Sequence, residues 1–125
     1  MATVFTPGTH ASTFGGNPLA TAAACAVMDL LSEGLIERVQ RAGERLSRGL
    51  SGIGSRTYGE RGMGLLRALL LTEDLAPRVV AKARDLGLLV NAVGDRVIRL
   101  APPLTVSDDE IDRASELLAE AVSKA

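Results

Sequence analysis

Hydrophobic residues recur at helical spacing along the first half of the chain. Asn17 is a good helix cap and Pro18 suits the first helical position. Apolar residues then repeat at helical spacing as far as Leu31. Gly34 is expected to end or kink this helix. A second amphipathic helix is predicted over residues 35–50, with an apolar side and a charged opposite side.

Shorter apolar runs separated by turn residues occupy the second half. Residues 65–71, 88–91 and 96–100 have the length of strands. The last two are expected to be joined by a turn around Gly94-Asp95. The stretch before them, residues 51–64, is rich in glycine and polar residues and is predicted to be a loop.

Two further helices are predicted in this half. The first is capped by Asp74 and stops at Gly87. The second begins at Ser107, and Glu110 lies three residues further on, at the capping-box spacing. The predicted fold class is α+β, with a small, mostly antiparallel sheet of about three strands and helices on one face.

The predicted organisation has two parts. Residues 1–16 form a loop arm, and residues 17–125 form a small domain with its two leading helices. No internal repeat is found.

Composition and charge narrow the function classes. The formal net charge is −1 and aromatic residues make up 2%, which argues against nucleic-acid binding because neither a basic field nor stacking rings are present. The single cysteine, Cys25, is expected to be a buried apolar residue, and no metal site is predicted. No stretch is expected to span a membrane, and a cytoplasmic location is the default.

The loop before the first helix is the most unusual segment. It places the hydroxyls of Ser12 and Thr13 and two glycines directly before a helix start, where backbone amides favour an anion such as phosphate. The same residues would equally suit a turn in which the hydroxyls satisfy the local backbone. His10, in the same loop, is predicted to be structural.

Arg99 is the second candidate site residue. It lies between Ile98 and Leu100, so strand alternation places it on the opposite face of the sheet from both. An arginine there could bind a carboxylate with two parallel hydrogen bonds. The alternative is a surface residue, or a structural ion pair with Glu60 or Asp95.

Three motifs together resemble one enzyme family. The stretch PGTHASTFGGNPLA at residues 7–20 is similar to a signature of class III, fold-type I pyridoxal-phosphate aminotransferases. RGMGLL at residues 61–66 and VN at residues 90–91, followed by VIRLAPPL at residues 97–104, resemble later segments of that family. The last pair points to its acetylornithine/ornithine subgroup, and the order of the motifs matches a carboxy-terminal portion.

The resemblance implies an activity and a set of contacts. Members pass an amino group from N-acetylornithine to 2-oxoglutarate in arginine biosynthesis, with pyridoxal phosphate as the electron sink, at a site on a homodimer interface. It implies that Thr13 hydrogen-bonds the cofactor phosphate of the partner subunit, that Ser12 lies beside bound acetylornithine and that Arg99 takes the α-carboxylate of the substrate. Partners are then a second copy and this small molecule, with no nucleic acid and no membrane.

The family's catalytic lysine has no counterpart in this sequence. The chain holds only Lys82 and Lys124, and neither lies in the family's lysine context. We therefore expect no catalytic residue here, no activity of the chain alone and no cofactor bound by it. A stand-alone, non-catalytic α+β domain that binds a partner subunit, a small anion or an amino acid is the alternative.

Overall fold

The computed structural model describes residues 6–125. The chain forms two compact units, Met1–Leu35 and Ile36–Ala125, and each is described by itself. The predicted arm of residues 1–16 lies within the first unit, and its residues 1–5 are outside the described part.

The first unit is a loop followed by helix α1, Pro18–Leu30, and by a kinked segment, η1, Leu31–Leu35, in which Glu33 and Gly34 leave the helical conformation. The side chain of Asn17 caps α1 by accepting a hydrogen bond from the amide of Ala20 at 2.9 Å. Gly34 has φ 97°, a left-handed conformation that interrupts the helix. The predicted cap and kink are both confirmed.

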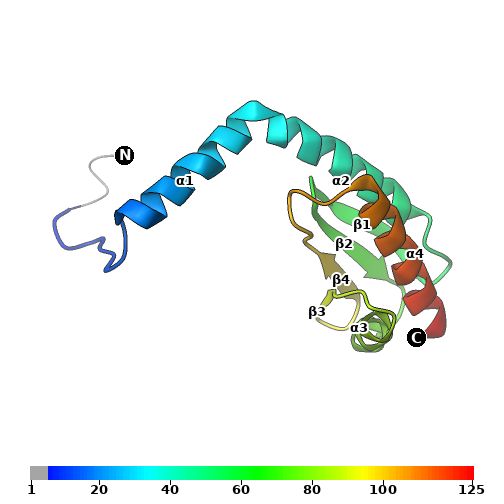
Figure 1. Cartoon of the computed structure of the whole chain (residues 1–125). Helices are drawn as coiled ribbons and strands as arrows, with labels where there is room; N and C mark the ends of the chain where they lie inside the picture. Colours follow the sequence, from blue (N-terminus) through cyan, green and yellow to red (C-terminus); the bar gives the residue numbers. More distant parts are fainter. Residues whose placement is uncertain (1–5) are drawn as a thin grey trace. The chain divides into compact units, whose positions relative to one another are not determined.

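The second unit is a four-stranded antiparallel sheet with three helices. The strand order is β1-β2-β4-β3, with each neighbouring pair antiparallel (Figure 1). The elements are α2 Ile36–Ser51, β1 Thr57–Met63, β2 Leu66–Leu71, α3 Ala76–Asp85, β3 Asn91–Val93, β4 Val97–Leu100 and α4 Asp108–Lys124. The predicted α+β class is confirmed.

The predicted number of strands was wrong by one. Strand β1 falls within the stretch predicted to be a loop, because its sequence, TYGERGM, lacks apolar alternation. It becomes a strand by pairing with β2 along a two-residue hairpin, in which Gly64, with φ 52°, holds the first turn position. At Gly62 a Cβ atom would lie 2.9 Å from the Cα of Arg67, so glycine lets the two strands approach.

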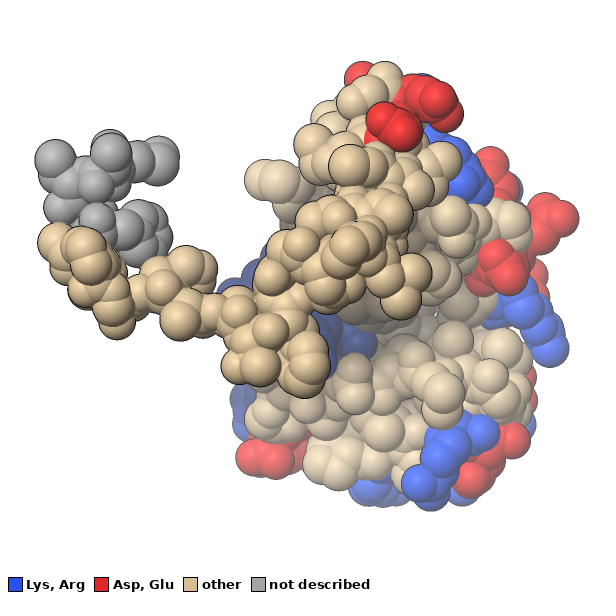
Figure 2. All heavy atoms as spheres, turned by 60° about the vertical axis from the view of Figure 1, so that its left-hand side comes forward, with Lys and Arg blue, Asp and Glu red and all other residues tan. Residues whose placement is uncertain are grey.

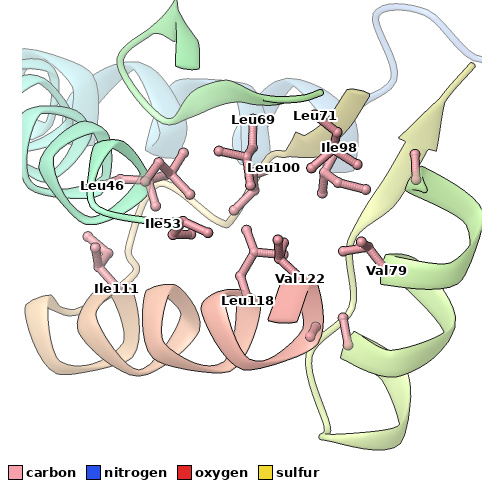
Figure 3. Close-up of a cluster of buried hydrophobic side chains, with 14 of the residues drawn as sticks. Leu46, Ile53, Leu69, Leu71, Val79, Ile98, Leu100, Ile111, Leu118 and Val122 are labelled. Carbon is pink, nitrogen blue, oxygen red and sulfur yellow. The ribbon is translucent and has the colours of Figure 1, made fainter. Parts of the chain in front are cut away.

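The hydrophobic core lies between one face of the sheet and the three helices. Figure 3 shows side chains from β2 and β4 pointing toward side chains from α2, α3 and α4. The largest fully buried members are Leu46, Leu50, Leu69, Leu71, Val79, Ile98 and Leu118. This leaves the opposite face of the sheet without a helix from this unit.

Two predicted helix caps in this unit have different outcomes. The capping box at Ser107 is confirmed, because its hydroxyl accepts from the Glu110 amide and the Glu110 side chain accepts from the Ser107 amide at 2.8 Å. The predicted cap at Asp74 is wrong: Leu75 precedes α3, and Asp74 pairs with Arg96 instead.

Helix α1 has no buried residue, and Cys25 is exposed rather than buried. Residues 6–28 contain no lysine, arginine, aspartate or glutamate, which gives the uncharged stretch beside the grey residues in Figure 2. The helical stretch Pro18–Ser51 is long and apolar enough to cross a membrane, judged by length and composition alone. The expectation that no stretch meets this criterion was wrong, although an apolar helix that packs on another protein meets it equally.

Candidate functional site

The helix-free face of the sheet, here called the open face, carries the candidate site. Strand alternation directs Ile98 and Leu100 of β4 into the core, where both are buried. Arg99 between them is exposed on the open face, as the sequence predicted.

The strand register aligns four residues in one row across this face. Arg61 of β1 is opposite Ala68 of β2, Ala68 is opposite Arg99 of β4, and Arg99 is opposite Asn91 of β3. Directly opposed residues of antiparallel strands project from the same face. Two arginines therefore flank a single alanine, and an asparagine lies at the edge.

Apolar side chains border this row on both sides. Met63 and Leu66 form one border, and Val97 and Val93 form the other, each as opposed cross-strand pairs. The row without Asn91 and both of its borders line a hollow of about 380 Å³, together with Gly62 and Arg67. The open face thus offers two guanidinium groups above an apolar floor.

Arg61 and Arg99 differ from neighbouring arginines in their electrostatic partners. Arg67 forms an ion pair with Glu60 at 3.2 Å, Arg56 with Glu73, and Arg96 with Asp74. Within residues 6–125, no carboxylate forms an ion pair with Arg61 or Arg99. The positive charge of these two guanidinium groups can therefore interact with solvent or with a bound anion.

Asn91 gives Arg99 a neutral partner. The Nη2 of Arg99 donates a hydrogen bond to the Oδ1 of Asn91 at 3.5 Å. The predicted alternative of an ion pair with Glu60 is not formed, because Glu60 faces the core side, where it accepts from Ser47 at 2.6 Å and pairs with Arg67. A neutral partner orients the guanidinium without cancelling its charge.

A second hollow begins beside the same arginine. This cavity of about 140 Å³ is lined by Arg99 and Asn91 and otherwise mainly by apolar residues from α2, α4 and the segments flanking β3 and β4. Its polar members besides this pair include Glu110, whose pKa is lowered by hydrogen bonds from the backbone and side chain of Ser107. Arg99 therefore lies at the border of two apolar recesses.

The other predicted site residues, Ser12 and Thr13, belong to the first unit. The Oγ of Ser12 accepts a hydrogen bond from the Gly15 amide at 2.9 Å, which is the turn-satisfying role that the sequence left open. Within residues 6–125, no hydrogen bond of the Thr13 hydroxyl is found. No cluster of His, Cys, Asp or Glu that could hold a metal ion is found among these residues either.

Sequence reasoning missed Arg61 and Asn91 as members of the site. Arg61 was noticed only within the RGMGLL motif, and its strand was predicted to be a loop. Asn91 could have been reached from Arg99 through the predicted hairpin of the last two strands, whereas Arg61 requires the pairing of β1 with β2.

Comparison with known proteins identifies the family of this chain. Residues 1–122 match the family Aminotransferase class-III, so the chain belongs to the class III aminotransferases. Pyridoxal phosphate is the cofactor of full-length members of this family.

Two curated relatives of this chain are acetylornithine aminotransferases. The acetylornithine aminotransferase of Mycobacterium tuberculosis is 46% identical over 113 residues, which cover 89% of this chain and 28% of the relative. That of Gloeobacter violaceus is 44% identical over 120 residues, covering 92% and 30%. The chain therefore spans less than a third of the length of these relatives.

Solved structures agree with the fold. The acetylornithine aminotransferase of Elizabethkingia anophelis has a TM-score of 0.83 and 31% identity, covering 99% of this chain and 33% of that one. The ornithine aminotransferase of Toxoplasma gondii has a TM-score of 0.78 and 37% identity, covering 97% and 30%.

Proposed function

We propose that this chain is the substrate-carboxylate-binding portion of an acetylornithine aminotransferase. The complete enzyme would transfer an amino group between N-acetylornithine and 2-oxoglutarate in the cytoplasm, for arginine biosynthesis. The family match and the names of the relatives support this proposal.

The observation that carries the proposal is the exposed guanidinium of Arg99. It lies on a strand that is paired on both sides, has a neutral hydrogen-bond partner in Asn91 and has no ion pair to a carboxylate within residues 6–125. Arginine binds a carboxylate through two parallel hydrogen bonds, which fixes the orientation of the carboxylate as well as its position. Apolar recesses on both sides of Arg99 can hold the aliphatic part of an amino acid.

The fit of the residues to pyridoxal phosphate is only partial. The Thr13 hydroxyl, in a loop before a helix amino terminus, suits the cofactor phosphate, and Ser12 beside it would face the substrate. The cofactor aldehyde needs a lysine amine. Lys82 is exposed on α3, and Lys124 pairs with Glu120 near the end of α4. Neither suits that role, so we assign no catalytic step to this chain and expect it to be inactive alone.

Self-association is the second part of the proposal. Helix α1 has no buried residue and exposes large apolar side chains, among them Leu19, Val27 and Leu30. An uncovered apolar helix is unfavourable in water, and a second copy of the chain would cover it.

The carboxylate site is tested by titrating the isotope-labelled chain with N-acetylornithine and following amide and guanidinium NMR signals. We expect signals of β3 and β4 to shift, and Arg99→Gln to weaken binding at least tenfold, because the substrate then loses a charge-assisted bidentate contact. Arg84→Gln removes the same charge from the exposed surface of α3 and should leave binding unchanged. Equal binding by the Arg99 variant and the parent chain would overturn the proposal.

A further inference from the structure

We propose that the charged side of α2 binds a small free anion that carries two linked phosphate groups, in a hollow formed by arginines. The site lies on the helices of the second unit. It uses neither Arg99 nor the open face of the sheet, so it is independent of the proposed function. Four arginines of α2 supply its positive charge, and they differ in whether a partner within the chain already compensates it.

The spacing of these arginines places them in two adjacent rows along α2. Helix residues seven apart lie almost on one line parallel to the axis, about 10 Å from each other. Arg38 is therefore aligned with Arg45. Arg41 is aligned with Arg48 in the same way. The two rows line a hollow of about 290 Å³, whose other lining residues are Ala42, Glu44 and Asp108.

The row formed by Arg38 and Arg45 is held in place by other segments of the second unit. The Nη2 of Arg38 donates hydrogen bonds to the carbonyl oxygens of Thr105 and Val106, both at 3.0 Å. Arg45 binds the carboxylate of Asp112 through two parallel hydrogen bonds. Carbonyl groups orient the Arg38 guanidinium without cancelling its charge, whereas a carboxylate compensates the charge of Arg45. This row therefore gives the hollow one fixed, uncompensated positive group.

The row formed by Arg41 and Arg48 is free to bind. Both side chains are exposed, and within residues 6–125 neither forms an ion pair. Glu37 and Glu44 each precede one of them by four residues, yet no ion pair joins them in the structure. Exposed helix pairs at this spacing contribute little, so an anion that engages both arginines can displace them.

The size and charge of the hollow favour two linked phosphate groups over one. Its volume equals that of about ten liquid water molecules, at ~30 Å³ each, which leaves room for both groups. An extended anion can reach both free arginines, whereas a single phosphate can pair fully with only one of them. Of the two lining carboxylates, Asp108 already pairs with Arg45 at 3.2 Å. Glu44 is then opposed by three guanidinium groups that no carboxylate of residues 6–125 compensates.

The lining distinguishes a free anion from a membrane surface or a nucleic acid. Ala42 is the apolar member of the lining and is buried, so no apolar side chain of the hollow can insert among lipid chains. Among the lining residues none is aromatic, so bases would find no ring on which to stack. The phosphate groups therefore belong to a small soluble molecule.

The test titrates the whole 125-residue chain with pyrophosphate, and separately with inorganic phosphate, at constant ionic strength. Amide NMR signals around Arg41 and Arg48 should shift, and pyrophosphate should bind about tenfold more tightly than phosphate because it gains a charge-assisted contact. Arg41→Gln and Arg48→Gln should each weaken pyrophosphate binding about tenfold. Glu44→Gln should tighten it about threefold, because it removes a negative group from the lining.

Two control variants separate a site from general charge attraction. Arg84→Gln removes a positive charge from the exposed surface of α3, and Arg99→Gln removes one from the open face. Neither should change pyrophosphate binding. A loss in either control as large as that in the Arg48 variant would show that no specific site exists on α2. Far-UV circular dichroism verifies that each variant keeps the fold of the parent chain.

Two further results would overturn the proposal. One is a parent chain that does not bind pyrophosphate, or binds it no more tightly than phosphate. The other is binding to phosphatidylglycerol vesicles that is lost in the Arg41 and Arg48 variants while pyrophosphate does not bind, which would assign these arginines to a lipid surface.

Discussion

Replacing Gly43 with alanine should destabilise the domain, although alanine is the better helix former. Gly43 is buried inside α2, and a Cβ atom there would lie 2.7 Å from the Cα of Gly64, in the β1–β2 hairpin turn. Carbon atoms pack best at about 3.5–4.0 Å, so helix and hairpin would have to separate. Overpacking of this kind costs about 1–3 kcal/mol, and the gain in helix propensity returns about 1 kcal/mol. Because the contacts are with backbone atoms, which cannot move aside by rotating, the cost lies in the upper part of that range, about 2–3 kcal/mol, and the net loss is about 1–2 kcal/mol.

Urea unfolding followed by far-UV circular dichroism measures this loss through the midpoint at an unchanged slope. Gly49→Ala is the matched control on the same helix. Its added Cβ would meet the side chain of Ser115, with the Ser115 Cβ at 2.9 Å, and not a backbone segment. The Ser115 hydroxyl can rotate away, whereas its Cβ needs a small shift of α4, so this variant should lose less stability than the Gly43 variant, under about 1 kcal/mol. A Gly43 variant as stable as the parent, or an equal loss in both variants, would refute the reasoning.

Three further predictions concern stability, pH and assembly. Glu60→Gln removes the charged partner of the largely buried Arg67 and should lower the free energy of unfolding in urea by about 1–2 kcal/mol. A matched change at an exposed ion pair should lower it by under about 1 kcal/mol. Because Ser107 lowers the pKa of Glu110 in the folded chain, the resulting stability is full above the ordinary glutamate range and is lost as the pH falls through the lowered pKa. Glu110→Gln, which removes the titrating group, should therefore flatten the acid limb of a stability–pH curve, and Ser107→Ala, which keeps the backbone hydrogen bond, should flatten it less; an unchanged limb in the Glu110 variant would count against this linkage. Ala23 lies on the same side of α1 as the exposed Leu19, Val27 and Leu30, at spacings of four and seven residues. Ala23→Glu should therefore shift sedimentation toward monomers more than Ala24→Glu, and a parent chain that is monomeric at high micromolar concentration would contradict the assembly.

The helices and their ends could be read from the sequence because their signals are local. The cap at Asn17, the kink at Gly34 and the capping box at Ser107 each depend on residues within one turn. Asp74 shows the limit of such reasoning. Its side chain suits a cap, but Arg96, distant in sequence, forms an ion pair with it instead.

The site could be predicted only in part. Strand alternation placed Arg99 on the open face, since alternation is a property of a single strand. Arg61 lies beside Arg99 only because of the register of three paired strands. The sequence of β1 has no apolar alternation from which that register could be predicted. The position of Arg61 in the site therefore follows from the pairing of strands distant in sequence, which the local sequence pattern does not reveal.

The central claim is that this chain recognises the substrate carboxylate but does not perform the amino transfer. Incubating the purified chain with pyridoxal phosphate, N-acetylornithine and 2-oxoglutarate, and measuring glutamate formation, tests this most directly. Borohydride reduction of a parallel sample, followed by peptide mass spectrometry, locates any cofactor bound to a lysine. We predict no glutamate and no adduct specific to Lys82 or Lys124. Turnover together with a specific adduct at either lysine would contradict the account.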